Sequence, residues 1–437
     1  MLKETRMNIG HTLTAGARWR PLALVVASLG GLALVASLTS ACSSSSAKPG
    51  ATASPASESA ATGSAVHIMV ISTFNNPAVD FSPNYEGAEV AAAAINRAGG
   101  IGGHKVVIDH CNDQFTSNLA LACARQAAAE KVIATVADET SFGNVVNPVL
   151  AQAKIPAVGI EAESSVDWGS PAAFPIVTLL PWSEVLVVAK QHNDTKVGWA
   201  YVNAPGAQGE ELAAESTATG PLGIKIVASP AVSVTATNYT NYVQELKSAG
   251  AEAVVLELAT GQIPAMINAA DSIGYHPLWL GNSGAIGPAG YKSFGAIASG
   301  MNLAEQLPPI SATTAYPAMR TWSGQIEAAG MSGVTNIDDA NAENGWLSVW
   351  AIAKFYAQQM KGAALTGPAL YAALTGDTTT PVNLFGIMRW TPGASGPTGY
   401  GRMASGDFWP SQVSGSSGSI VLGAHAPVDF YTAVGLK

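Results

Sequence analysis

The chain has 437 residues, of which 48% are hydrophobic and only 12% are charged, and its formal net charge is −9. Four of its 21 basic and one of its 30 acidic residues lie in the first 42 positions, so the remainder carries 17 basic and 29 acidic side chains. The length allows two domains with substantial cores. The acidic balance, without any Lys/Arg-rich stripe, argues against a surface for nucleic acid or anionic lipid.

The first 42 residues have the pattern of a targeting segment. A basic region ends at Arg20, an uncharged run covers residues 21–38, and small residues precede Cys42. Residues 1–42 therefore resemble a bacterial lipoprotein signal peptide, in which Cys42 becomes the lipidated first residue of the mature chain. The alternative is an uncleaved membrane anchor, since the apolar run is just long enough to span a bilayer. Both interpretations place the rest of the chain outside the cytoplasm.

Residues 43–65 are rich in Ser, Ala, Gly, Thr and Pro and lack large apolar side chains, so they predict a flexible linker. The two remaining cysteines, Cys111 and Cys123, are expected to form a disulfide in an oxidising compartment, with two free thiols as the alternative. Their spacing is not a paired CxxC pattern and no histidine cluster accompanies them, so no metal site is expected.

The first predicted structural unit is a strand over residues 67–73 followed by a helix. Ser82 is the expected N-cap of this helix, Pro83 its first helical residue, and Gly99 its left-handed C-cap. The glycines that follow predict a sharp turn into a strand at 105–109. The buried stripe of the helix is expected at positions three or four residues apart, namely Tyr85, Ala88, Ala92 and Ile95.

Strand-like and helix-like segments continue to alternate along the chain. Strands are predicted at 132–137, 155–160, 197–202, 224–229, 251–258 and 278–283, and helices end near 153 or lie near 208–218, 239–249 and 262–274. Apolar strands separated by helices predict an α/β fold with parallel sheets and right-handed crossovers. Such sheets bind ligands at the carboxyl ends of their strands.

Two segments carry a family resemblance. "GAEVAAAAINRAGGIGGHKVVIDHCND" (87–113) and "KVIATVADETSFGNVVNPVLAQAKIPAVGI" (131–160) resemble the branched-chain amino acid (Leu/Ile/Val-binding) proteins of ABC transporters, which are type I periplasmic binding proteins. Residues 250–282 and "NLFGIMRW" (383–390) are similar to a strand–helix unit of that family's second lobe and to a late strand. The resemblance covers nearly all of residues 66–437.

The resemblance implies two Rossmann-like lobes with parallel central sheets, joined by a three-stranded hinge. Lobe one would comprise residues 66–181 plus 312–388, and lobe two residues 182–311 plus 389–437. One ligand would be clamped between the lobes, and a permease that prefers the closed form would detect that the protein is loaded.

The family holds its ligand's carboxylate in the loop after the third strand and at the end of the fourth. These places correspond to Thr140 and Ser141 and to Ala162, Glu163 and Ser164. Hydroxyls and N–H groups at a helix start suit an anion or a carbonyl. The alternative is that Thr140 or Ser141 only caps the helix that follows.

The second lobe departs from the amino-acid pattern at three expected ligand-binding positions. Gln208 and Ala259 stand where the family has aromatic residues, and Ser283 stands where the acidic partner of the ligand's ammonium is expected. An α-amino group desolvated without a carboxylate partner would be costly. These departures favour an amide, a polyol or an amine over leucine, isoleucine or valine.

The first lobe adds acidic residues that the family pattern does not require. Asp138 and Glu139 follow one predicted strand, and Glu161 and Glu163 follow the next. Converging on the cleft, they would suit an amine or a polyhydroxylated ligand; the alternative is that they face solvent. Four aromatic residues near the cleft loops are candidates for stacking on a ligand, with core packing as the alternative: Phe74, Phe142, Trp168 and Trp182.

The chain is therefore expected to be a monomeric, lipid-anchored extracytoplasmic binding protein that delivers a small polar solute to an ABC permease. G-x-S-x-G, HExxH and P-loop motifs are absent, so neither an enzyme nor a cofactor is expected. A receptor that reports its ligand to a membrane sensor is the alternative, and a hydrolase is a more distant one.

Overall fold

Two β-sheets form the framework of the chain. The computed structural model describes residues 61–437 except 77–78, 162–164, 179, 204–206, 397–400, 403 and 437. The predicted signal peptide, Cys42 and most of the predicted linker therefore lie outside the described residues. Residues from Ser57 onward belong to one unit, in which both sheets are found.

The first sheet has five strands in the order β2-β1-β3-β4-β5, and every neighbouring pair is parallel. Its strands are β1 (Gly63–Ser72), β2 (His104–Asn112), β3 (Ala134–Val136), β4 (Ala157–Val158) and β5 (Ala173–Phe174). The interior strands β3 and β4 are short and fully buried, which explains why they lack an alternating polar pattern.

The second sheet has nine strands with the main order β15-β14-β11-β10-β9-β6-β7. The predicted strands β6 (Lys196–Val202), β7 (Lys225–Ala228), β9 (Ala253–Glu257) and β10 (Leu278–Gly281) are parallel, and so is β11 (Asn302–Glu305) beside β10. One edge is antiparallel instead, because the chain returns there after the last crossover. The antiparallel strands are β14 (Asp407–Ser414), β15 (Ser419–Leu422) and β16 (Val428–Asp429). A short strand, β8 (Ala231–Val232), pairs in parallel with β6.

Helices cover both sheets, and the predicted helices lie close to their expected positions. They are α1 (Ser82–Arg97), α2 (Ser117–Glu130), α3 (Gly143–Ala153), α4 (Ser165–Gly169), α5 (Pro181–Gln191), α6 (Ala207–Ala214), α7 (Gly220–Leu222), α8 (Thr240–Ala249), α9 (Gln262–Ser272), α10 (Gly287–Phe294), α11 (Pro317–Ala329), α12 (Ala340–Phe355), α13 (Gly367–Gly376) and α14 (Phe430–Ala433). Within the described ranges, no helix combines the length and apolar character needed to cross a membrane.

The start of α1 differs from the prediction in one detail. The helix begins at Ser82 itself, and the Ser82 hydroxyl donates to Asp80 Oδ1 (2.5 Å) instead of capping the first turn. Of the predicted stripe, Ala88, Ala92 and Ile95 are buried, whereas Tyr85 is half-buried.

The turn after α1 reverses the chain as the glycines predict. Gly99 has a φ of +101° and Gly100 a φ of +80°. A Cβ atom at Gly100 would overlap the His104 carbonyl, so the turn needs glycine for space as well as for backbone conformation. The strand that follows carries Cys111, which forms the expected disulfide with Cys123 on α2.

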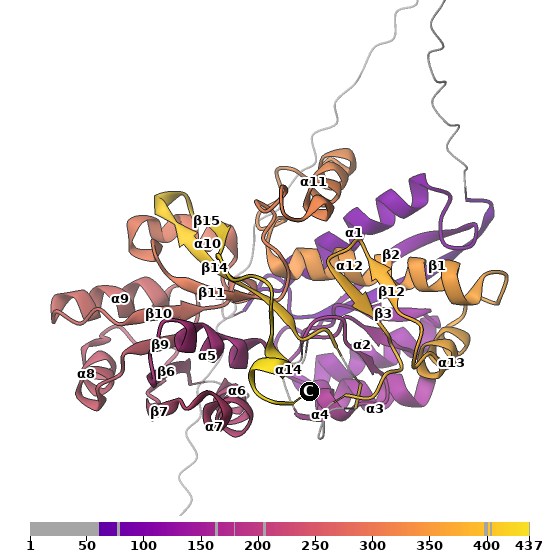
Figure 1. Ribbon diagram of the computed structural model, residues 1–437. Coiled ribbons are helices and arrows are strands. Elements are labelled where there is room, and N and C mark those ends of the chain that lie inside the picture. The colour runs from indigo at the N-terminus through magenta and orange to yellow at the C-terminus, as the bar shows by residue number, and fades with distance from the viewer. Residues whose placement is uncertain are drawn as a thin grey trace, which may run out of the picture. The chain divides into compact units, whose positions relative to one another are not determined.

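Helix α12 comes from the last third of the chain yet lies directly against α1 (Figure 1). Neither Gly87 on α1 nor Gly345 on α12 leaves room for a side chain. A Cβ at Gly87 would overlap the Ala342 carbonyl oxygen, and one at Gly345 would overlap the Asn84 carbonyl oxygen. The two backbones therefore approach through glycines, and α12 becomes part of the core of the first sheet.

The segments that connect the two sheets are joined by hydrogen bonds. Gln306 Nε2 donates to the Thr178 carbonyl (2.7 Å), and the Ser311 hydroxyl donates to the Ile420 carbonyl (2.7 Å). The late strand expected at 383–390 is an antiparallel hairpin of β12 (Val382–Leu384) and β13 (Met388–Trp390). The division into lobes at residues 181, 311 and 388 stays a prediction.

Gly345→Ala is expected to lower the free energy of unfolding by about 1–3 kcal/mol, because the added methyl group forces α1 and α12 apart. Gly324→Ala on α11 is the matched control, since a Cβ there meets nothing within 4 Å. It should be neutral or stabilise by up to about 1 kcal/mol through helix propensity. Urea denaturation measures both variants, and equal stabilities would contradict the packing argument.

Candidate functional site

The carboxyl ends of the first sheet bring acidic residues together. Isolated parallel bridges join Ser72 to Glu139 and Glu139 to Glu161, so these residues lie side by side after β1, β3 and β4. The Glu139 backbone N–H donates to the Ser72 hydroxyl (2.9 Å). As in other open α/β sheets, the strand ends form the edge at which polar groups gather.

Side-chain amides from α1 and α12 bind two of these carboxylates. Asn84 Nδ2 lies 2.8 Å from Glu139 Oε2, and Asn341 Nδ2 lies 3.1 Å from the same oxygen. Asn344 Nδ2 donates to Glu161 Oε1 (2.9 Å). The close packing of the two helices thus supplies donors to acids at the sheet edge.

Asn341 also reaches the second sheet. Its Nδ2 donates to the carbonyl of Gly284 (3.1 Å), which lies in the loop after β10. A Cβ at Gly284 would stand 2.5 Å from Asn341 Oδ1, so glycine is required for this contact. One side chain thereby joins the strand-end loops of both sheets.

Asp138 lies deeper than a cleft residue. It is buried, and its Oδ1 accepts a hydrogen bond from the Ile71 backbone N–H (2.8 Å). Burial raises the pKa of Asp138 to about 7, against the lowering effect of its hydrogen bonds. Its carboxyl group therefore serves the backbone of β1.

The acidic residue expected at position 283 is found instead on the neighbouring strand, β11, as Glu305. The Ser283 hydroxyl donates to Glu305 Oε2, and the Ser283 backbone N–H donates to Glu305 Oε1 (3.3 Å). Both residues are buried, and burial raises the pKa of Glu305 to about 7. The acid that Ser283 lacks is thus supplied by the end of β11.

A cavity of about 350 Å³ opens beside this pair. Its charged lining comes from the end of β11, the start of α12 and α10, and comprises Glu305, Asp338, Asp339, Glu343 and Lys292. Asp339 caps α12 by accepting a hydrogen bond from the Ala342 N–H (2.8 Å). The lining is therefore acidic, and its one base, Lys292, has an exposed side chain.

Glu184, in the first turn of α5, is another buried acid near the strand ends. Neither of its carboxylate oxygens has a hydrogen-bond partner among the described residues. Burial raises the pKa of Glu184 well above its usual value, and repulsion from Glu305, Glu161 and Asp407 adds to this. A buried charge without a partner is costly, so burial favours the neutral form of this carboxyl group.

The predicted first-lobe ligand residues are only partly described. The Thr140 hydroxyl donates to Asp113 Oδ2 (2.5 Å) and accepts from the Phe142 N–H (3.3 Å), so it serves the turn before α3. Ser141 is half-buried. Ala162, Glu163 and Ser164 lie outside the described residues.

The predicted second-lobe residues follow three neighbouring strands of the second sheet, β6, β9 and β10. Gln208 is exposed on α6, whereas Ala259 is half-buried after β9 and donates its N–H to Gln262 Oε1 (3.3 Å). Ser283 lines the acidic cavity. Their roles in ligand binding stay predictions.

The candidate aromatic residues contact other parts of the protein. Phe74 is buried and meets the His110 ring edge-on at 5.6 Å between centroids, and Phe142 meets Phe115 at 5.9 Å. Trp168 and Trp182 are partly buried against the core of the second sheet. These contacts match the core-packing alternative.

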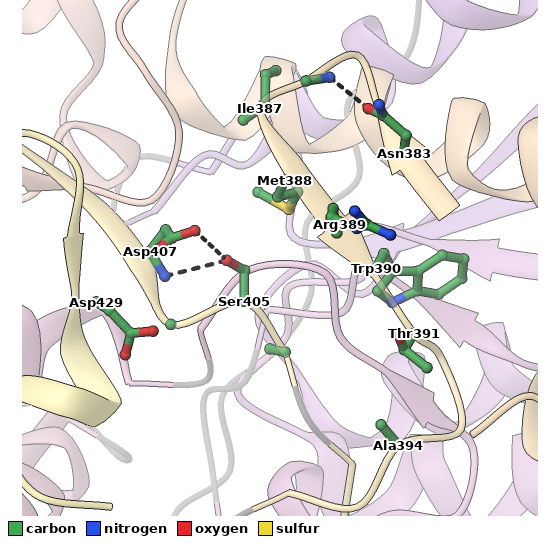
Figure 2. Close-up of a pocket in the computed structure, with 13 residues that line it drawn as sticks. Asn383, Ile387, Met388, Arg389, Trp390, Thr391, Ala394, Ser405, Asp407 and Asp429 are labelled. Carbon is green, nitrogen blue, oxygen red and sulfur yellow. Dashed lines mark hydrogen bonds between the residues drawn. The ribbon is translucent and has the colours of Figure 1, made fainter. Parts of the chain in front are cut away.

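A larger cavity of about 520 Å³ lies between the β12–β13 hairpin and the segment that leads into β14 (Figure 2). The charged residues in its lining are one base, Arg389, and two acids, Asp407 and Asp429. The Ser405 hydroxyl lies 3.3 Å from Asp407 Oδ2 and accepts from the Asp407 N–H (3.2 Å), as Figure 2 shows. Two of its lining residues, Trp390 and Ser405, donate hydrogen bonds to the Pro175 and Ile176 carbonyls directly after β5. The smaller cavity lies at the carboxyl ends of β10 and β11 and gathers the buried acids, so it is the better candidate.

Sequence reasoning missed the polar residues at the start of α12. "DDANAEN" (338–344) precedes the apolar run of the same helix and supplies Asp339, Asn341, Glu343 and Asn344, all four of which are buried. The signal that the sequence offered was four polar residues within six positions, directly before an apolar helical run. Among the described residues, no group of three or more His, Cys, Asp or Glu is arranged to hold a metal ion.

Comparisons with known proteins agree with this architecture. A family model described as "Periplasmic binding protein" matches residues 65–414. No curated protein matches the chain by sequence. A branched-chain amino acid ABC transporter protein from Thermus thermophilus with bound valine is 17% identical, with a TM-score of 0.67, covering 85% of this chain and 98% of that one.

Two further solved structures have the same fold. A fatty acid ABC transporter substrate-binding protein from Thermomonospora curvata is 14% identical, with a TM-score of 0.70, covering 86% of this chain and 95% of that one. A solute-binding protein from R. palustris in complex with 4-hydroxybenzoate is 17% identical, with a TM-score of 0.67, covering 84% and 97%. At these identities the likeness concerns the fold alone.

Glu305→Gln is expected to stabilise the protein relative to wild type as the pH rises from 5 to 8. The pKa of Glu305 is raised by folding, so its favourable contribution is complete below about pH 4.5 and is lost as the pH rises through about 7. The wild type loses up to about 1.4 kcal/mol per pH unit in this window through Glu305, and the amide cannot ionise.

The measurement is the melting temperature of both proteins at several pH values. Glu252→Gln is the control, because hydrogen bonds from the Thr195 and Lys196 N–H groups lower the pKa of Glu252 and leave it ionised throughout this range. A Glu305→Gln variant that follows the wild type at every pH would contradict the assignment.

Proposed function

Because the chain belongs to the periplasmic binding protein family, we propose that it is the extracytoplasmic solute-binding component of an ABC importer. Its residues 65–414 match the family model, and its structural neighbours are binding proteins. A small polar solute would bind between the strand ends of the two sheets and be delivered to a permease in the cytoplasmic membrane. The protein would act as a monomer without a cofactor.

The contact made by Asn341 is the observation that carries this proposal. A single buried amide touches Glu139 at the edge of the first sheet and the Gly284 carbonyl at the edge of the second. Polar groups of both sheets therefore meet where α/β sheets bind ligands. A solute inserted here would contact both, and its binding would change how the two edges meet.

The solute class follows from the chemistry of these edges. The neighbours are named for valine, a fatty acid and 4-hydroxybenzoate, so the fold itself does not select a ligand. In this chain Thr140, expected to bind a carboxylate, is already bonded to the Asp113 carboxylate. Carboxylates also dominate the cavity beside Ser283. These features favour an amine, an amide or a polyol over a branched-chain amino acid.

A thermal-shift screen of residues 43–437 with amino acids, amides, amines and polyols tests the proposal. A bound solute at a hundred times its dissociation constant should stabilise the fold by about 2.7 kcal/mol. Asn341→Ala should weaken the response. Asn383→Ala, at the other cavity, should not. No response from any class, or equal responses from both variants, would contradict this site.

Attachment to the membrane through lipid on Cys42 is part of the proposal, and it rests on the sequence pattern alone. Metabolic labelling with a radioactive fatty acid should label the wild-type protein and not Cys42→Ser, since the thiol is the acceptor of the lipid. Ser44→Ala is the control and should keep the label. A wild-type protein that stays unlabelled yet remains in the membrane fraction would favour the uncleaved anchor instead.

A further inference from the structure

Three residues that the fold brings together from different elements line the acidic cavity. Glu305 ends β11, Ser283 follows β10, and Glu343 lies in the first turns of α12. The volume of about 350 Å³ is within the range of pockets that hold small organic ligands. Glu305 and Glu343 are each only 2% exposed, so their carboxyl groups belong to the interior.

Glu343 has hydrogen-bonding capacity that the protein does not use. Its Oε1 is buried and has no hydrogen-bond partner among the described residues. Glu305 is bonded through Ser283, and Asp339 is bonded to the Ala342 N–H. An orphaned buried oxygen in the wall of a cavity is a position that a ligand donor would satisfy.

Among the described residues, no basic side chain forms an ion pair with this cluster. The two ion pairs found in the described part of the chain both involve histidine and lie elsewhere, between His67 and Asp109 and between His276 and Asp271. Lys292 lines the cavity but has an exposed side chain, so it lies on the solvent side. Burial raises the pKa of Glu343 well above its usual value, and repulsion from Glu305, Asp339 and Asp338 adds to this.

We propose that this cavity binds the protonated amine of the transported solute, with Glu343 and Glu305 as its carboxylate partners. The inference rests on the proposed function and specifies its solute class. An ammonium group brings up to three N–H donors, which suits the unused oxygen of Glu343 and the carboxylate that Ser283 orients. A carboxylate group of a ligand would be repelled at the same place.

The proposal is tested by isothermal titration calorimetry with two matched pairs of probes. Butylamine and 1,4-diaminobutane carry the ammonium group, whereas 1-butanol and 1,4-butanediol have the same chain length without charge. Residues 43–437 contain the whole unit that begins at Ser57, so they are a suitable preparation. At least one amine should bind, and its neutral partner should bind at least tenfold more weakly.

Glu343→Gln should weaken amine binding at least tenfold, because it removes the charge and keeps the shape. The amide replaces a buried acid, so the variant should fold, and a melting temperature without ligand that is no lower than that of the wild type verifies this. Glu211→Gln is the control, since Glu211 is also a buried acid with a raised pKa but does not line the cavity. Its amine affinity should equal that of the wild type.

Three outcomes would overturn the inference. Amine binding that Glu343→Gln leaves unchanged would place the ammonium group elsewhere. Binding of neutral or carboxylate-bearing solutes only, without any amine, would reject the solute class and leave the proposed function intact. An absence of binding to the amines, together with no response in the wider solute screen, would reject both.

Discussion

The contact between α1 and α12 is the constraint on which the arrangement of the site depends. Two glycines, Gly87 and Gly345, let the helix backbones touch, although the helices come from opposite ends of the chain. Once α12 is fixed against α1, its first turns must lie at the carboxyl edge of the first sheet. Asn341 and Asn344 then meet Glu139 and Glu161 without further adjustment. Packing in the core thereby decides which polar groups meet at the edge of the sheet.

The buried carboxyl groups in this region have neutral hydrogen-bond partners. Burying a carboxylate without a cation is costly, and proteins commonly offset the cost by pairing or by protonation. Here the partners are amides, backbone N–H groups and hydroxyls, as at Glu139, Asp339 and Glu305. Glu184 lacks even these. The low overall charge content of the chain leaves few basic side chains for neutralisation, and burial raises the pKa values of Glu184, Glu305 and Asp339.

The sequence predicted the fold well because the information for it is local. Apolar strands, glycine turns and helix periodicity marked β1 to β4 of the first sheet, β6, β7, β9 and β10 of the second, and helices α1, α3, α6, α8 and α9, and the expected disulfide is present. They did not mark β5, β11 or helices α5 and α10 to α13. The hairpin at 382–390 and the antiparallel edge formed by β14 and β15 escaped prediction. Strand direction there depends on where the last crossover returns, which no local pattern records.

The site was harder to predict for a related reason. Glu305 and Ser283 come together across two neighbouring strands, and Asn341 reaches Gly284 from another sheet. Single positions such as Ser283 showed that an acid was missing, but they did not show that an adjacent strand supplies one. Residues carried over from the family pattern, including Gln208 and Ala259, do not gather around this cavity.

The double contact of Asn341 has a consequence for an importer that works by recognising a loaded protein. In the proposed clamp, the hydrogen bond from Asn341 to Gly284 would favour the closed state even without a solute, by about 1 kcal/mol. The binding of a solute would then have to supply only the rest of the free-energy difference between the open and the closed state. The same bond raises the fraction of empty protein that resembles the loaded form. A stronger bond from Asn341 to Gly284 would therefore raise the affinity for the solute, but it would also raise the share of empty protein that the permease recognises.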